Sequence, residues 1–152
     1  MEWVQKEGTV ATAPGAVTSI EDLELFSDCS RSELREINGL TTLLRVPKDR
    51  VLMREGDAPK EFIIIGSGHA RVTRETDRGT TVVTTVGDGE ILGEMALLMG
   101  IRRTATATAE TDLTVFVSSV SEFRTILRIA PSVARKVHQT LRSRAEGLAV
   151  AA

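Results

Sequence analysis

Aromatic residues are scarce in this chain, at 3% of 152 residues with no tyrosine, so aliphatic side chains must supply its core. A single cysteine, Cys29, excludes an internal disulfide and favours a reducing compartment. No stretch approaches the roughly 18 to 20 apolar residues of a membrane-spanning helix. The first residues, Met1–Glu7, lack the basic start and the apolar run of a signal peptide. These absences predict a cytoplasmic protein that does not cross a membrane.

A large excess of charge is also missing. The chain has 19 basic and 21 acidic residues, for a net charge of −2, which gives no overall attraction to nucleic acid or to an anionic membrane. Its 41% hydrophobic and 26% charged residues are typical of one ordinary soluble domain. We predict a flexible N-terminal tail over residues 1–18, one domain over residues 19–148, and a short C-terminal tail over residues 149–152.

The middle of the chain consists of short apolar runs separated by turn residues such as Gly66–Gly68 and Gly87–Gly89. This spacing is typical of a roll or sandwich of antiparallel strands. The predicted strands are Leu43–Val46, Val51–Arg54, Phe62–Ile65, Ala70–Thr73, Thr81–Val86, Thr104–Ala109 and Leu113–Val117.

Helical signals flank the strands. Ser30–Glu33 and Ser119–Glu122 each have the form of a capping box, in which a serine and a glutamate three residues later satisfy the first backbone N–H groups of a helix. Pro131 suits the first position of a last helix. The predicted order is therefore helix, strand roll and two helices, an α+β fold.

One segment, Gly87–Thr106, interrupts the rhythm of the strands. Gly93 would let the backbone come close to a ligand. A short helix beginning near Glu94 would offer unpaired backbone N–H groups and the positive end of its dipole to an anion. Arg103 could add a bidentate guanidinium contact to the same anion. Glu94 would repel a phosphate, so a sugar hydroxyl is the more suitable partner for its carboxylate. The segment predicts a site for a small phosphorylated ligand.

This segment resembles the phosphate-binding cassette of the cyclic nucleotide-binding domain family. That family includes the bacterial catabolite activators and the regulatory subunits of cAMP-dependent protein kinase. The resemblance extends from about Leu23 to Leu148, and includes the turn Arg54–Asp57 and the spacing of Phe123 and Pro131. It implies an antiparallel β-roll, a jelly-roll-like double-stranded β-helix, with flanking N- and C-terminal helices and a short phosphate-binding helix.

The resemblance also implies roles for particular residues. Arg103 would bind the exocyclic oxygens of a cyclic phosphate, and Glu94 would bind the ribose 2′-hydroxyl. Close backbone contacts would come from Gly93, Met95, Ala96 and Thr104. The apolar wall under the purine would be formed by Val72, Val83 and Val86.

The family resemblance leads us to expect a regulatory sensor that binds cAMP in preference to cGMP. Thr104 does not decide between the two purines, because both kinds of binder carry a hydroxyl residue there. We expect the ligand to reposition the C-terminal helix, from about Pro131 to Glu146. The alternative is a degenerate β-roll that only binds other proteins. An enzyme is not expected, because no nucleophile with a base, no carboxylate pair and no metal ligands stand out.

Toward the end of the chain, Arg128, Arg135 and Arg142 recur at intervals of seven, with Lys136 and Arg144 nearby. We interpret these residues as a solvated face, because the chain as a whole is slightly acidic. The opposite face could pack on the roll, pair with a second copy of the chain or bind another protein. That face comprises Ala134, Val137, Leu141 and Leu148. We expect no DNA-binding domain in this chain.

Overall fold

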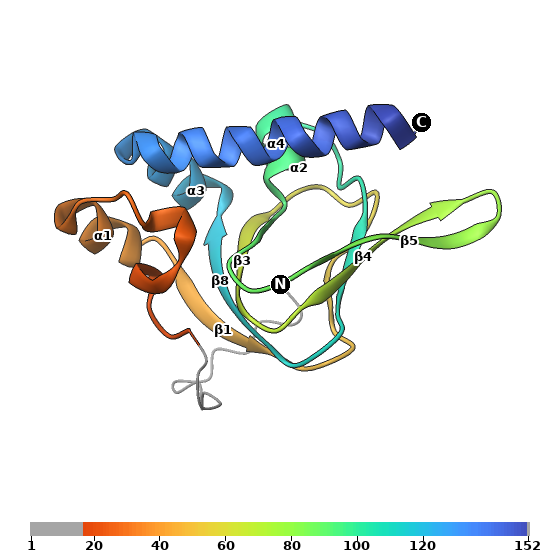
Figure 1. The fold of residues 1–152 in the computed structure, drawn as a ribbon, viewed down its shortest axis with the longest axis horizontal. Coiled ribbons are helices and arrows are strands. Elements are labelled where there is room, and N and C mark those ends of the chain that lie inside the picture. The colour runs from red at the N-terminus through yellow and green to blue at the C-terminus, as the bar shows by residue number, and fades with distance from the viewer. Residues whose placement is uncertain (1–16, 152) are drawn as a thin grey trace.

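The computed structural model describes residues 17–151, with side chains for residues 17–147, so nearly all of the predicted N-terminal tail lies outside the described residues. Two four-stranded antiparallel sheets form a roll, with helices packed at one side (Figure 1). The first sheet has the order β1 (Thr42–Val46), β8 (Leu113–Ser119), β3 (Glu61–Ser67), β6 (Ile91–Leu92). The second has the order β2 (Val51–Met53), β7 (Thr106–Ala109), β4 (Ala70–Thr76), β5 (Gly79–Val86).

Strand β3 explains how this aliphatic chain builds two cores. Successive side chains of a strand point to opposite faces. Ile63 and Ile65 therefore join the cluster inside the roll, while Phe62 and Ile64 join a second cluster between the roll and the helices. Phe62 stacks on Phe123 with ring centroids 4.2 Å apart, so two of the few aromatic residues attach the helices to the sheet.

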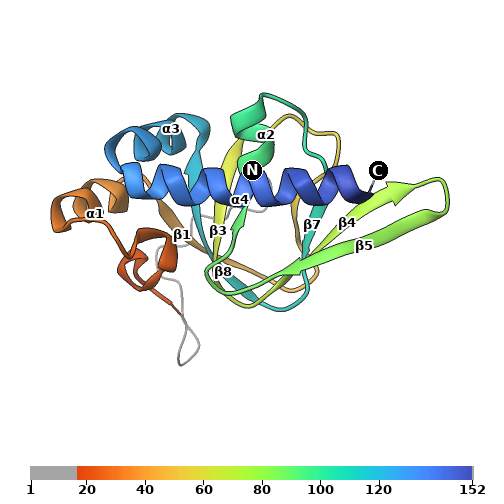
Figure 2. The ribbon, with the colours of Figure 1, turned by 45° about the horizontal axis from the view of Figure 1, so that its top comes forward.

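The two predicted capping boxes are confirmed. Ser30 accepts from the Glu33 backbone N–H at 3.1 Å and caps α1 (Arg31–Asn38), and Ser119 does the same from Glu122 at 3.1 Å for α3 (Val120–Ile129). Helix α4 begins at Pro131 as predicted and runs to Ala151, beyond the predicted domain end. It passes over α2 (Glu94–Met99) toward the second sheet (Figures 1 and 2). Two short 3₁₀ helices, η1 (Ile20–Asp22) and η2 (Glu24–Phe26), precede α1.

Most predicted strands differ from the structure by one to three residues at their ends, and β3 extends over Glu61–Ser67 where Phe62–Ile65 was predicted. Strand β6 is only two residues long, too short for a periodic signal. The strand predicted over Thr104–Ala109 begins at Thr106, because the residues before it continue the cassette. Strands β4 and β5 are longer than predicted and form a hairpin that projects beyond the roll (Figure 2).

Candidate functional site

Glycines bracket the short helix of the cassette. Gly93 precedes α2 with φ 93°, and Gly100 ends it with φ 64°, both in the left-handed region that favours glycine. Gly93, the N-cap residue, has no side chain that could cap the first turn of α2. The predicted start of the helix at Glu94 is confirmed.

Arg103 reaches the start of this helix. Its side chain is buried, with 4% of the residue exposed. Nη1 donates to the Gly93 carbonyl at 3.1 Å, and Nη2 donates to the Glu61 carbonyl at 2.7 Å. The Glu61 carboxylate lies 3.9 Å from Nη2. Arg103 is thus held by backbone carbonyls on two sides, which fixes its guanidinium at the start of α2.

Burial and charge act in opposite directions on this pair. Loss of hydration lowers the pKa of Arg103, and the carboxylates of Glu61, Glu94 and Asp57 oppose that shift. Loss of hydration also raises the pKa of Glu61, against the opposing charge of Arg103. A buried cation and a buried carboxylate therefore face each other where the phosphate of a ligand is expected.

Glu94 is also buried, and its partner comes from α4. Arg144 Nη1 donates to both carboxylate oxygens of Glu94, at 2.7 and 2.8 Å, and its Nη2 donates to the Ile91 carbonyl at 2.7 Å. Only 1% of Glu94 is exposed. The carboxylate expected to bind ribose is therefore engaged by the C-terminal helix in this structure.

The expectation of a fully solvated basic face on α4 is wrong for two residues. Arg144 binds Glu94, and Lys136 Nζ donates to the Glu24 carbonyl at 2.7 Å and to Ser27 Oγ at 2.8 Å. Arg135 and Arg142 are exposed, as expected. The partners of Arg144 and Lys136 lie 50 and about 110 residues away in the chain, so helical periodicity alone could not find them.

The other predicted contacts lie around the same cassette. Met95 and Ala96 are buried on α2, and Thr104 Oγ1 lies 3.9 Å from Met95 Sδ. Val72 and Val86 are buried inside the roll, at 8% and 2% exposure.

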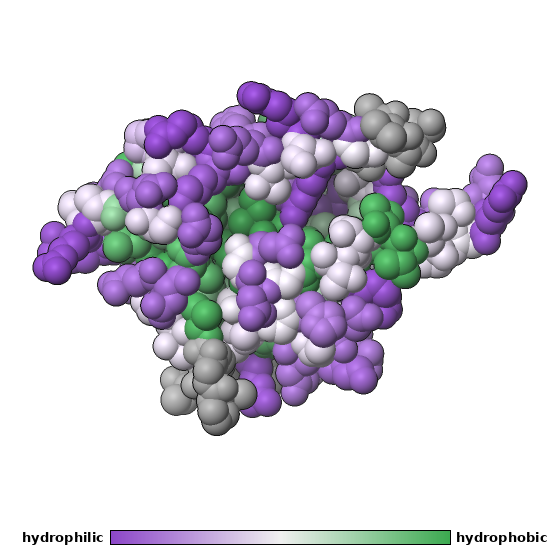
Figure 3. All heavy atoms as spheres, in the orientation of Figure 1, coloured by the Kyte–Doolittle hydropathy of each residue, from purple (hydrophilic) through white to green (hydrophobic). Residues whose placement is uncertain are grey.

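Val83, the third valine of the expected purine wall, differs from the other two in its exposure. It is 49% exposed, because β5 is the edge strand of its sheet and all of its residues except Val86 are exposed. With Val82 it forms an exposed hydrophobic patch on the hairpin (Figure 3).

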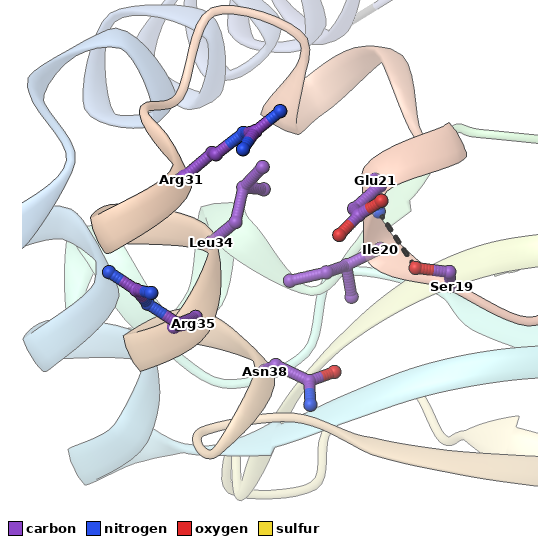
Figure 4. A pocket seen from close by; sticks show the side chains of 7 residues that line it. All are labelled: Ser19, Ile20, Glu21, Arg31, Leu34, Arg35 and Asn38. Carbon is purple, nitrogen blue, oxygen red and sulfur yellow. Dashed lines mark hydrogen bonds between the residues drawn. The ribbon is translucent and has the colours of Figure 1, made fainter.

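Two hollows differ in their relation to the cassette. One of about 590 Å³ includes Arg103 and Glu61 in its wall, together with residues of β2 and the loop that follows it. The other, of about 540 Å³, lies between η1 and α1, and Ser19, Arg31 and Asn38 contribute to its wall (Figure 4). None of the predicted ligand-binding residues lines the second hollow, so the first is the one that bears on the cassette.

Other kinds of site find no support among the described residues. Within residues 17–147, no group of three or more histidine, cysteine, aspartate or glutamate side chains is arranged to hold a metal ion. No helix in the described part of the chain has the length and apolar character needed to span a membrane.

Comparison with known proteins places this geometry in a family. Residues 43–129 match the cyclic nucleotide-binding domain. The chain is 34% identical over 107 residues to the acetyltransferase Pat of Mycolicibacterium smegmatis, covering 70% of this chain and 32% of that protein. It is 32% identical over 108 residues to the cAMP-dependent protein kinase regulatory subunit of Yarrowia lipolytica, covering 71% of this chain and 28% of that protein. The chain thus spans about a third of the length of these relatives.

A solved structure shows the same fold. The Thermus thermophilus catabolite activator protein superposes with a TM-score of 0.73 and 24% identity, over 83% of this chain and 60% of that one. The structural match covers the β-roll. The region matched by the family, residues 43–129, is more than half of the sequence. The chain belongs to the family of cyclic nucleotide-binding regulatory domains.

Proposed function

We propose that this domain is a sensor that binds cAMP, with Arg103 on the cyclic phosphate and Glu94 on the ribose 2′-hydroxyl. The observation that carries the proposal is the position of Arg103, buried at the start of α2 beside the left-handed Gly93. Backbone N–H groups, a helix N-terminus and a guanidinium are the groups that proteins use to bind phosphate. The relative named for cAMP dependence, from Yarrowia lipolytica, supports cAMP as the first ligand to test.

Calorimetric titration of the chain with cAMP and with cGMP tests this proposal. We expect both to bind, with cAMP favoured because the Yarrowia lipolytica relative is named for cAMP dependence. Thr104, next to Arg103 in the sequence, offers a hydroxyl that could accept a hydrogen bond from the guanine 2-amino group. A single hydrogen bond contributes about 0.5 to 1.5 kcal/mol, or at most roughly a tenfold preference. Thr104→Ala should therefore reduce cGMP affinity more than cAMP affinity. A large preference for either nucleotide that Thr104→Ala leaves unchanged would assign purine recognition to another residue.

We further propose that nucleotide binding repositions α4. The Glu94 carboxylate would serve two partners, the ribose hydroxyl of the ligand and Arg144 of α4. A ligand that changes how Glu94 is bonded would favour a different position of the helix, since the two arrangements then differ in ligand contacts. The Arg144 contacts to Glu94 and to the Ile91 carbonyl support this route from the cassette to the helix.

Amide hydrogen exchange with Arg144→Ala tests the coupling. In the wild type, we expect cAMP to change exchange in α4 over residues 131–146 as well as in the cassette. Arg144→Ala should retain the change in the cassette and lose most of the change in α4, because the only charged link described between them is removed. Arg142→Ala, which removes an exposed arginine of the same helix, is the matched control. Protection gained in the wild-type cassette with none changed in α4 would make the domain a passive binder.

The same proposal assigns the domain no chemistry of its own. The acetyltransferase relative is about three times longer than the matched region, so its activity does not transfer to this chain by similarity. A role as the sensing part of a larger assembly fits a family whose members are regulatory domains.

A further inference from the structure

Glu61 is an unusual neighbour for an arginine that receives a phosphate. It lies at the first position of β3 and is buried, with 8% of the residue exposed. Its carbonyl accepts from Arg103 Nη2 at 2.7 Å, and its carboxylate oxygen lies 3.9 Å from the same nitrogen. One residue thus supplies both a fixed acceptor and a negative charge to the predicted phosphate-binding arginine.

We infer that the Glu61 carboxylate competes with the ligand phosphate for Arg103, so that Glu61 lowers nucleotide affinity at neutral pH and makes binding tighter in acid. The inference rests on the proposed function. In the free domain the carboxylate is the counter-charge of Arg103. When a phosphate arrives, two anions share one guanidinium, and like charges in a buried site repel.

A proton on Glu61 removes this repulsion. Glu61 lies in the wall of the hollow of about 590 Å³, and 11% of its side chain is exposed, so a proton can reach the carboxyl from solvent. Burial already raises its pKa in the free domain, and a bound phosphate would raise the pKa further by adding a negative charge. The complex therefore binds protons more readily than the free domain does, and linkage requires affinity to rise as pH falls.

The charges around Glu61 are mainly basic. The hollow that it shares with Arg103 also includes one aspartate, Asp57, and no histidine. From β8, the residue paired with Glu61 is the uncharged Ser119, whose backbone N–H binds Glu122. Glu94, on α2, acts on Arg103 rather than on Glu61. The basic residues in the wall of the hollow are Arg50, Arg54, Lys60, Arg102 and Arg103.

Glu61→Gln preserves the shape of the side chain and removes its charge. We expect this variant to bind cAMP roughly three- to tenfold more tightly than the wild type at pH 7.5, and by a smaller margin at pH 5. Glu36→Gln, which removes an exposed carboxylate on α1, is the matched control and should follow the wild type at every pH. Isothermal titration from pH 5 to pH 8, in two buffers of different ionisation enthalpy, measures both the affinity and the protons taken up.

The outcomes separate this inference from the proposed function. Proton uptake on binding in the wild type and Glu36→Gln, lost in Glu61→Gln, would support the inference. Weaker binding by Glu61→Gln would show that the carboxylate positions Arg103 and would overturn it. Wild-type binding of cAMP with no proton uptake would overturn the inference and leave the proposed function intact, even if Glu61→Gln did not fold. No wild-type binding at any pH would overturn both.

Discussion

Arg103→Ala is expected to weaken cAMP binding by more than roughly tenfold, because truncation of a buried charge partner typically costs about 2 to 5 kcal/mol. The buried guanidinium is fixed by the Gly93 and Glu61 carbonyls before any ligand arrives. Phosphate binding therefore has a small conformational-entropy cost, because the Arg103 side chain is already ordered. Titration of the variant beside the wild type measures the loss.

The neighbouring residue provides the control. Arg102 carries the same charge but is exposed, and its Nη1 donates to the Gly56 carbonyl at 3.0 Å. Arg102→Ala should change cAMP affinity by less than about twofold, since an exposed charge is screened by solvent. Arg103→Lys keeps the positive charge and loses the planar guanidinium with its bidentate donors. Its affinity for cAMP should therefore lie between those of the alanine variant and the wild type. Equal affinities for Arg103→Ala and the wild type would remove Arg103 from the site.

Removal of Arg103 should also affect folding, and the experiment must separate the two effects. Without the guanidinium, the Glu61 carboxylate would be buried and would lose the one ion pair that it makes within residues 17–147. An uncompensated buried charge is destabilising. Thermal unfolding of each variant without ligand therefore accompanies the titrations, which are performed well below the unfolding midpoint.

Local rules were sufficient to predict much of the fold. Both capping boxes, the first residue of α4 and the start of α2 follow from signals within four residues of each helix end. Strand positions followed from alternating apolar runs and turn residues. The two-residue β6 depends on pairing with the distant strand β3, and no local pattern reports it. The exposure of Val83 depends on the position of β5 at the edge of its sheet, which a local pattern does not report either.

The candidate site divides in the same way. Gly93, Glu94 and Arg103 lie within eleven residues of one another in the sequence, so a motif could identify them. The residues that hold them, Glu61 and Arg144, come from β3 and α4. A glutamate at the start of a strand and an arginine on a basic helix are usually solvated. Only the tertiary structure shows that both are partners of the cassette.

Gly93→Ala should lower both the stability of the fold and the affinity for cAMP. Gly93 has a left-handed backbone, and the space that its Cβ would occupy is already filled by neighbouring atoms. A Cβ there would meet Arg103 Nη1 and would lie 3.1 Å from the Glu61 carbonyl oxygen. The alanine variant would have to strain its backbone, at roughly 1 to 2 kcal/mol, and also displace the guanidinium. We expect Gly93→Ala to lower the free energy of unfolding by about 2 to 4 kcal/mol and cAMP affinity by more than roughly tenfold.

Gly89→Ala distinguishes the two contributions. Gly89 also has a left-handed backbone, with φ 80°, but a Cβ at that position would meet nothing within 4 Å. Its alanine variant should show only the backbone strain, a loss of about 1 kcal/mol in the free energy of unfolding, with cAMP affinity close to that of the wild type. Denaturant unfolding and cAMP titration of both variants make the comparison. Gly89→Ala leaves the contact between residue 93 and Arg103 unchanged. If both variants lost the same cAMP affinity, the crowding of Arg103 by a Cβ at position 93 would not be the reason for glycine at the start of α2.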